Sequence, residues 1–204
     1  MRYDSKSHHR RSIRLKGYDY TQSGACFVSI TTQNRECFFG SISKGQLQLN
    51  EAGLMVQRIW DEMPAHYPGF ETDAFIVMPN HIHGIIVCVG ATTRGCPLSD
   101  PDSGQAQGPA PTYLSLPDVI HRLKTLTTKQ YTDGVKLYDW PVFHGRLWQR
   151  NYYEHIIRNE RELARIRHYI RDNPVNWLFD RENISGKSRP LESDSSEHDE
   201  SWCI

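Results

Sequence analysis

The order of hydrophobic and polar positions along the chain predicts alternating strands and helices. Segments rich in β-branched and aromatic residues are typical of strands, and apolar residues three or four positions apart are typical of helices. The predicted strands are residues 25–32, 74–77, 81–89 and 147–157, and the predicted helices are residues 50–63, 116–131 and 159–173. This β-α-β-β-α-β-α order predicts an α+β, ferredoxin-like split βαβ fold: an antiparallel sheet with helices on one face, plus a C-terminal helix.

The predicted helices carry recognisable ends and apolar stripes. Asn50 and Asn159 are expected N-caps, and Glu162 completes a capping-box pattern with Asn159. Pro117 suits a first turn, whereas Pro174 is expected to end the last helix. The expected buried stripes are Leu54, Ile59 and Met63, then Ile120, Leu123 and Leu126, and finally Leu163, Ile166 and Ile170.

Composition divides the 204 residues into one domain with tails. Hydrophobic residues make up 38% and the mean hydropathy is −0.63, so some segments are expected to contribute nothing to a core. We predict a basic arm over residues 1–17, one domain over residues 18–179 with a flexible insertion at 90–112, and an acidic disordered tail over residues 180–204.

Several protein classes are disfavoured by the sequence. No apolar run is long enough for a membrane span, and the basic start lacks the apolar region of a secretory signal. The five cysteines never form C-x-x-C, which argues against a disulfide framework or a zinc knuckle. These features indicate a cytoplasmic protein with reduced thiols.

A net charge of zero argues at first against a nucleic-acid partner, but the charge is unevenly distributed. Residues 1–16 hold six basic residues against one acidic residue, and residues 145–171 hold seven against three. Residues 180–204 hold seven acidic residues against three basic ones. Because the local field decides binding, the two basic regions leave DNA binding open.

His81 and His83 lie two positions apart on a predicted strand, so both side chains face the same side of the sheet. Two adjacent imidazoles on an open sheet face can hold one divalent ion, and with an amide or water oxygen they suit Mn²⁺ or Mg²⁺. The next residue, Gly84, is expected to leave room for a bulky ligand. The alternative is an ordinary histidine pair that binds nothing.

Tyr169 and Asn173 lie four positions apart on the last predicted helix and share a face, with Arg165 one turn earlier. The apolar stripe of the helix lies on another side. Tyr169 is therefore either an edge residue with its hydroxyl in water or a functional group. Asn173 is either a helix-ending residue or an oxygen donor aimed at a metal.

Two segments carry a resemblance to a known family. Residues 78–84 (MPNHIHG) resemble the His-hydrophobe-His motif of the IS200-like superfamily of HUH endonucleases. Residues 169–175 (YIRDNPV), the preceding residues 147–153 (LWQRNYY) and Lys124-Thr125 resemble a branch of that superfamily, the REP-associated tyrosine transposases. The resemblance spans about residues 11–178.

The resemblance implies a single-strand DNA endonuclease and strand transferase that acts at REP-type hairpins. Tyr169 would be the catalytic nucleophile that forms a 5′-phosphotyrosine, and His81, His83 and Asn173 would bind the metal, Mg²⁺ or Mn²⁺. Asn173 stands where insertion-sequence relatives have Gln. Those relatives work as dimers with shared active sites, whereas this branch is expected to be monomeric and associated with the nucleoid.

Single-stranded or hairpin DNA would be held by positive charge and by stacking. The candidate DNA-binding residues are Arg10, Arg11, Arg14, Lys124, Lys129, Arg146, Arg150, Arg158 and Arg165. Trp148, Tyr152 and Tyr153 are interleaved with them as candidates for base stacking, and the two tyrosines are also rival nucleophiles.

Two other functions compete with the transposase reading. One is a ferredoxin-like nucleic-acid-binding module without catalysis, although the aromatic signature of an RNA-recognition motif is absent from the sequence. The other is a metal-dependent hydrolase that uses the histidine pair and water, and its activity would survive removal of the Tyr169 hydroxyl.

Overall fold

A computed structural model of the chain describes residues 24–88 and 114–186. The basic arm with Arg10, Arg11 and Arg14, the 90–112 insertion, and residues 187–204 of the predicted tail lie outside these ranges. None of the helices in the described ranges is long and apolar enough to cross a lipid bilayer.

The central sheet has four antiparallel strands in the order β4-β5-β1-β6. These strands are β1 (Gly24–Thr31), β4 (Phe70–Val77), β5 (His81–Cys88) and β6 (Tyr153–Ile157). The unit β1-α1-β4 is split because β5 lies between its two strands. This topology confirms the predicted α+β, ferredoxin-like split βαβ fold.

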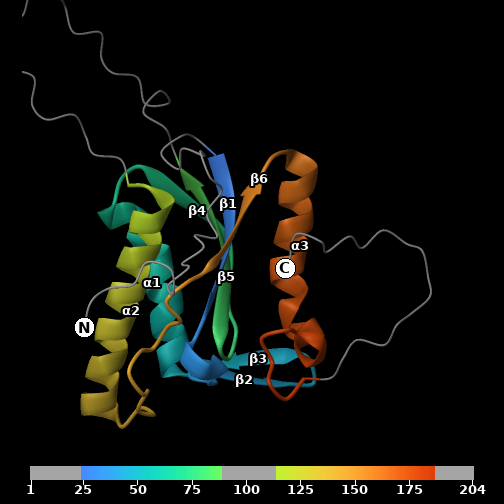
Figure 1. The fold of residues 1–204 in the computed structure, drawn as a ribbon. Helices are drawn as coiled ribbons and strands as arrows, with labels where there is room; N and C mark the ends of the chain where they lie inside the picture. Colours follow the sequence, from blue (N-terminus) through green and yellow to red (C-terminus); the bar gives the residue numbers. More distant parts are fainter. Residues whose placement is uncertain (1–23, 89–113, 187–204) are drawn as a thin grey trace, which may run out of the picture.

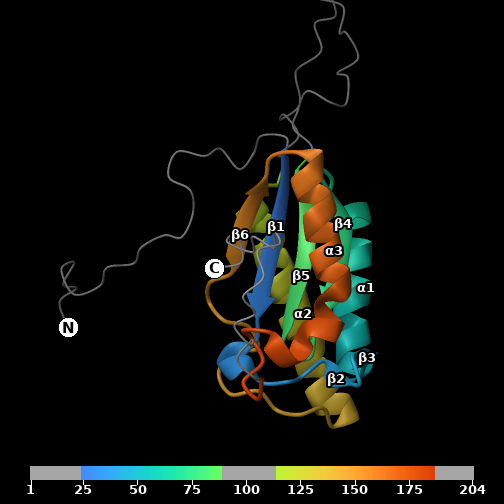
Figure 2. The same ribbon diagram turned by 90° about the vertical axis from the view of Figure 1, so that its right-hand side faces the viewer.

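Helices cover both faces of the sheet. Helices α1 (Glu51–His66) and α2 (Leu116–Tyr138) lie on one side, and the C-terminal helix α3 (Glu160–Asn176) lies on the other, as Figures 1 and 2 show. Alternate residues of each strand therefore enter different cores. Val28 and Ile82 pack towards α1 and α2, whereas Phe27 and Ile85 pack with Ile166 and Ile170 of α3.

Both predicted asparagine N-caps are confirmed. The Asn50 Oδ1 accepts a hydrogen bond from the Gly53 N–H at 2.9 Å, and the Asn159 Oδ1 accepts one from the Glu162 N–H at the same distance. Each cap satisfies a backbone donor that the first turn of a helix leaves unpaired.

Two details of the predicted helices are wrong. Leu54 is exposed, and the α1 stripe consists of Met55, Val56, Ile59 and Met63. Pro174 lies inside α3, which continues to Asn176 and passes into the short helix η2 (Trp177–Phe179). A proline near the end of a helix removes only one late backbone hydrogen bond, so the final turn tolerates it.

A hairpin at the base of the molecule was not predicted. Strands β2 (Gly40–Ser43) and β3 (Gln46–Leu49) form a separate two-stranded sheet below the main one (Figure 1), after the short helix η1 (Gln33–Arg35). The last strand is also shorter than predicted, because Trp148 contributes only an isolated bridge to Thr32.

The space beside Gly84 is filled by protein. A Cβ at this position would lie 2.5 Å from Cη2 of Trp60 and 2.9 Å from Cδ2 of Phe75. These two rings stack at 4.1 Å between centroids, on the sheet face that packs against α1. The expectation that Gly84 leaves room for a ligand is therefore wrong, since its missing side chain makes room for Trp60.

Candidate active site

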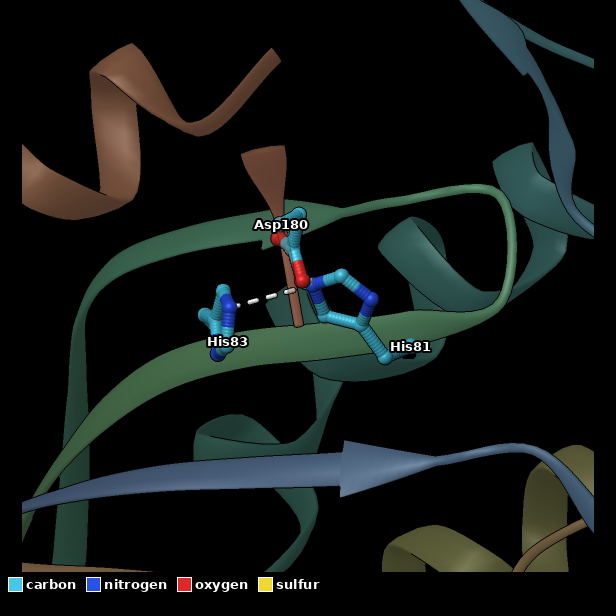
Figure 3. Close-up of side chains that lie close together, drawn as sticks. All are labelled: His81, His83 and Asp180. Atoms are coloured by element: carbon cyan, nitrogen blue, oxygen red, sulfur yellow. Dashed lines mark hydrogen bonds and ion pairs between the residues drawn. The ribbon is translucent and has the colours of Figure 1, made fainter. Parts of the chain in front are cut away.

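His81 and His83 lie at the start of β5, on the sheet face that α3 covers. Their Nε2 atoms are 3.0 Å apart, so both imidazoles point at one place, as Figure 3 shows. The expectation of an open sheet face is wrong here: His81 is 0% exposed and His83 is 4% exposed. The ring of Trp177, in η2, lies 6.0 Å from that of His81 and helps to bury it.

Tyr169 reaches the histidine pair from α3. Its hydroxyl lies 3.5 Å from the His83 Nε2, and the two ring centroids are 5.3 Å apart. Phe27 of β1 lies beside both rings, with ring centroids 5.3 Å from His83 and 6.0 Å from Tyr169. The half-buried Tyr169 is thus held against the sheet by packing, with its hydroxyl directed at the pair.

Asn173, one turn after Tyr169, joins the same cluster. Its side chain is buried and interacts with His81 and with Asp180. Within the described ranges its Oδ1 meets no donor at hydrogen-bonding geometry. A buried oxygen without a donor costs free energy unless a cation or water satisfies it.

Asp180 completes the cluster and was missed by the sequence analysis, which assigned it to the tail. Its Oδ2 lies 3.7 Å from the His81 Nε2, and its side chain is only 6% exposed. Ligand atoms of His81, His83 and Asp180 all lie within 4.8 Å of one another. Two neutral imidazole nitrogens with carboxylate and amide oxygens form a donor set suited to a divalent ion.

Burial governs the protonation of these groups. Burial lowers the pKa of His81 to about 3, and burial together with the neighbouring His81 lowers the pKa of His83 well below its ordinary value. Both rings are therefore neutral near pH 7, which is the form that ligates a metal. Burial also raises the pKa of Asp180, and a nearby positive ion would oppose that shift.

The other aromatic candidates make different contacts. Trp148 is 4% exposed, and its Nε1 donates to the Thr127 hydroxyl at 2.8 Å. The stacking role considered for Trp148 is therefore wrong. Tyr152 packs towards the α1–α2 core and Tyr153 towards α3, where its ring lies 6.3 Å from Phe27.

The described candidates for DNA contact fall into two groups. Lys124 is turned inwards, and its Nζ donates to the carbonyls of Gln149, Arg150 and Asn151. The remaining candidates have exposed side chains: Lys129, Arg146, Arg150, Arg158 and Arg165.

A cavity of about 370 Å³ adjoins the histidine pair. Ser29 and Thr31 line it, and the strand register places them opposite His83 and His81. The rest of its lining comes from Gln149, Asn151, Tyr152, Tyr153, Glu154 and Glu182. The cavity therefore extends from the histidine pair towards β6.

Comparison with known proteins finds a relative that matches most of the chain. An "Uncharacterized protein" of Haemophilus influenzae is 37% identical over 179 residues, which cover 88% of this chain and 96% of that protein. The chain belongs to the family of that protein. No family model matches the chain.

A second relative carries a functional name. The Haemophilus influenzae protein called "Putative REP-associated tyrosine transposase" is 28% identical over 162 residues, covering 77% of this chain and 73% of that protein. The chain is thus similar to a protein that carries the family name to which the motifs pointed. A solved REP-associated tyrosine transposase bound to a REP hairpin matches with a TM-score of 0.49 and 20% identity, over 82% of this chain and 74% of the other.

Proposed function

We propose that this protein is a tyrosine transposase that cleaves and rejoins single-stranded DNA beside hairpins of the REP type. The observation that carries the proposal is the approach of the Tyr169 hydroxyl to within 3.5 Å of His83, inside a cluster of metal-binding side chains. The kinship with a protein named as a REP-associated tyrosine transposase supports the same chemistry.

In the proposed reaction, the Tyr169 hydroxyl loses its proton to solvent and its oxygen attacks the scissile phosphorus. A 5′-phosphotyrosine forms, and the 3′-oxygen leaves and takes up a proton from solvent to become a 3′-hydroxyl. The covalent intermediate retains the phosphodiester bond energy, so a 3′-hydroxyl can reverse the step and join strands without ATP. A phenol with an ordinary pKa near 10 is a weak nucleophile at pH 7 and needs activation. Arg165, one turn earlier on α3, would supply positive charge to the bound phosphate.

His81, His83 and Asn173 would hold the divalent ion, and the nearby carboxylate of Asp180 would add a further oxygen ligand. Mg²⁺ or Mn²⁺ bound there would polarise the phosphate and offset the charge of the transition state. The unsatisfied, buried Oδ1 of Asn173 is the observation that favours such an occupant.

The proposal includes a monomeric enzyme that acts on hairpin DNA. One chain can supply both Tyr169 and the histidine pair, which supports a monomeric enzyme. The cavity between Ser29, Thr31 and Tyr153 offers space for a nucleotide that flanks the phosphate. Exposed basic side chains would contact the DNA backbone. These are Lys129, Arg146, Arg150, Arg158 and Arg165, together with Arg10, Arg11 and Arg14 of the arm.

The test is incubation of the full chain with a labelled single-stranded hairpin DNA and Mn²⁺ or Mg²⁺. We expect a protein–DNA adduct that survives SDS and disappears in Tyr169→Phe. Tyr138→Phe is the matched control, because it removes an exposed hydroxyl at the end of α2, on the sheet side opposite α3, and should leave the adduct unchanged.

Cleavage that continues unchanged in Tyr169→Phe would overturn the proposal and favour the hydrolase. DNA binding without cleavage by the wild type would favour the non-catalytic module.

A further inference from the structure

The orientation of the Asn80 side chain is set by two backbone carbonyls. Asn80 immediately precedes β5 and is 1% exposed. Its Nδ2 donates to the Arg35 carbonyl at 3.1 Å and to the Glu182 carbonyl at 2.7 Å. Because a carbonyl oxygen only accepts hydrogen bonds, the amide NH₂ must face these two groups, and the Asn80 Oδ1 must face the other way.

That orientation determines where His81 carries its proton. The Asn80 Oδ1 lies 2.8 Å from the Nδ1 of His81. An amide oxygen only accepts, so His81 must donate from Nδ1. A neutral imidazole has a single N–H, which leaves the Nε2 of this buried ring with a free lone pair.

We propose that Asn80 is a positioning residue that holds His81 in the Nδ1–H tautomer, with the Nε2 lone pair directed at the metal site. The lone pair then faces the Nε2 of His83 at 3.0 Å and the Oδ2 of Asp180 at 3.7 Å. Ligating histidines depend on such a partner at their second nitrogen, which fixes the tautomer and the ring orientation. This inference rests on the proposed function, because that function requires the metal. The tautomer itself is a property of the metal-free protein and can be measured without DNA.

Asn80 also links His81 to the turn that carries Asp180. The Glu182 carbonyl that accepts from Asn80 belongs to a residue whose N–H donates to the Asp180 Oδ1 at 2.7 Å. The Glu182 carboxylate is in turn paired with Arg35 at 3.0 Å. One buried amide therefore connects a histidine and a carboxylate that are far apart in the sequence.

His83 lacks a corresponding partner. Among the described residues, nothing bonds to its buried Nδ1. In the metal-free protein the Nε2 of His83 carries the proton and donates to the unprotonated Nε2 of His81, because two lone pairs at 3.0 Å would repel each other. The two histidines should thus show opposite tautomers.

The experiment measures tautomer and metal affinity without DNA. Long-range ¹H–¹⁵N correlation spectra of the metal-free full chain should show an Nδ1–H at His81 and an Nε2–H at His83, with His83→Gln used for assignment. Asn80→Asp keeps an acceptor and should retain the His81 tautomer. Asn80→Ala removes the acceptor; we expect His81 to lose its single tautomer and Mn²⁺ affinity, measured by electron paramagnetic resonance, to fall about 10- to 100-fold.

Asn176→Ala is the matched control: it removes an exposed asparagine of α3 whose amide donates to the Asp172 carbonyl, and it should change neither readout. An Nε2–H at His81 in the wild type would overturn the inference. So would a folded Asn80→Ala protein that binds Mn²⁺ as the wild type does. If Asn80→Ala does not fold, an Nε2–H at His81 in Asn80→Asp overturns it.

The two proposals can fail separately. If the protein shows the expected tautomers and Mn²⁺ affinities but does not cleave hairpin DNA, this inference is supported and the proposed function is contradicted.

Discussion

The ammonium of Lys124 lies against protein backbone, although sequence analysis placed it among the DNA contacts. It donates to three consecutive carbonyls, at Gln149, Arg150 and Asn151, and lies 5.5 Å from the centre of the Tyr152 ring. The segment that it binds leads into β6 and lines the cavity beside the histidine pair. Lys124 therefore holds the wall of the site in place from α2. Any effect of Lys124 on DNA binding would be indirect, through the position of that wall.

Lys124→Met should lower the free energy of unfolding by about 1–3 kcal/mol, because carbonyls that accept from a charged donor lose their partner. Lys129→Met, an exposed change on the same helix, should stay within about 0.5 kcal/mol of the wild type. Denaturant unfolding of both variants measures the difference. Equal stabilities would contradict the role assigned to Lys124.

The stability difference should also depend on pH. Burial lowers the pKa of Lys124 from 10.5 to about 8. Between these values the unfolded chain binds the proton that the folded chain has released, so the free energy of unfolding rises with pH. We expect the stability of the wild type, relative to Lys124→Met, to increase from pH 8 towards 10.5. A difference that stays flat or falls over this range would contradict the burial of the charge.

At the scale of the element, the two faces of β5 have different roles: one carries the candidate site and the other packs into the core. Its histidines face α3, whereas Gly84 on the opposite face receives the Trp60 ring of α1. Helix α3 is fixed over the histidine face by Ile166 and Ile170, and by an ion pair between Arg167 and Asp73 of β4. The position of Tyr169 therefore depends on how β5 packs on both sides.

Gly84→Ala should destabilise the fold by about 1–3 kcal/mol, because its methyl group would lie 2.5 Å from the Trp60 ring. Combining it with Trp60→Leu, which removes the ring, should give a double variant more stable than the sum of the two single effects. Thermal unfolding of the four proteins completes the cycle. Strictly additive effects would show that the contact with Trp60 is not the cause.

The same elements show what could be predicted from sequence. Strand alternation predicts that His81 and His83 face one side of the sheet and Ile82 the other. Helical spacing predicts that Tyr169 and Asn173 share a face. Both predictions succeed because each periodicity depends only on local backbone geometry. The burial of the histidines, the inward turn of Lys124 and the position of Asp180 were not predictable. Each depends on where α3, η2 or the segment before β6 packs on the sheet, and no local pattern encodes such contacts.

At the scale of the whole molecule, the net charge of zero conceals opposed regions. Residues 187–204 hold five acidic residues against Lys187 and Arg189, so a chain that ends at Gly186 carries a net charge of +3 and keeps Asp180 and Glu182. Under the proposed function, basic residues of the arm and of α3 would attract DNA phosphates, and they would attract an acidic segment of the same chain for the same reason. We therefore predict that the acidic segment competes with DNA.

Truncation after Gly186 should raise the affinity for single-stranded hairpin DNA about tenfold at low salt. The advantage should shrink as salt rises, because both the competing contacts and the DNA contacts are screened. A full-length control with Glu192→Gln, Asp194→Asn, Glu197→Gln, Asp199→Asn and Glu200→Gln keeps the segment and removes its negative charge. If charge is the cause, this control should match the truncated protein, whereas a gain seen only on truncation would indicate steric blocking. No gain at low salt in either protein would refute the competition.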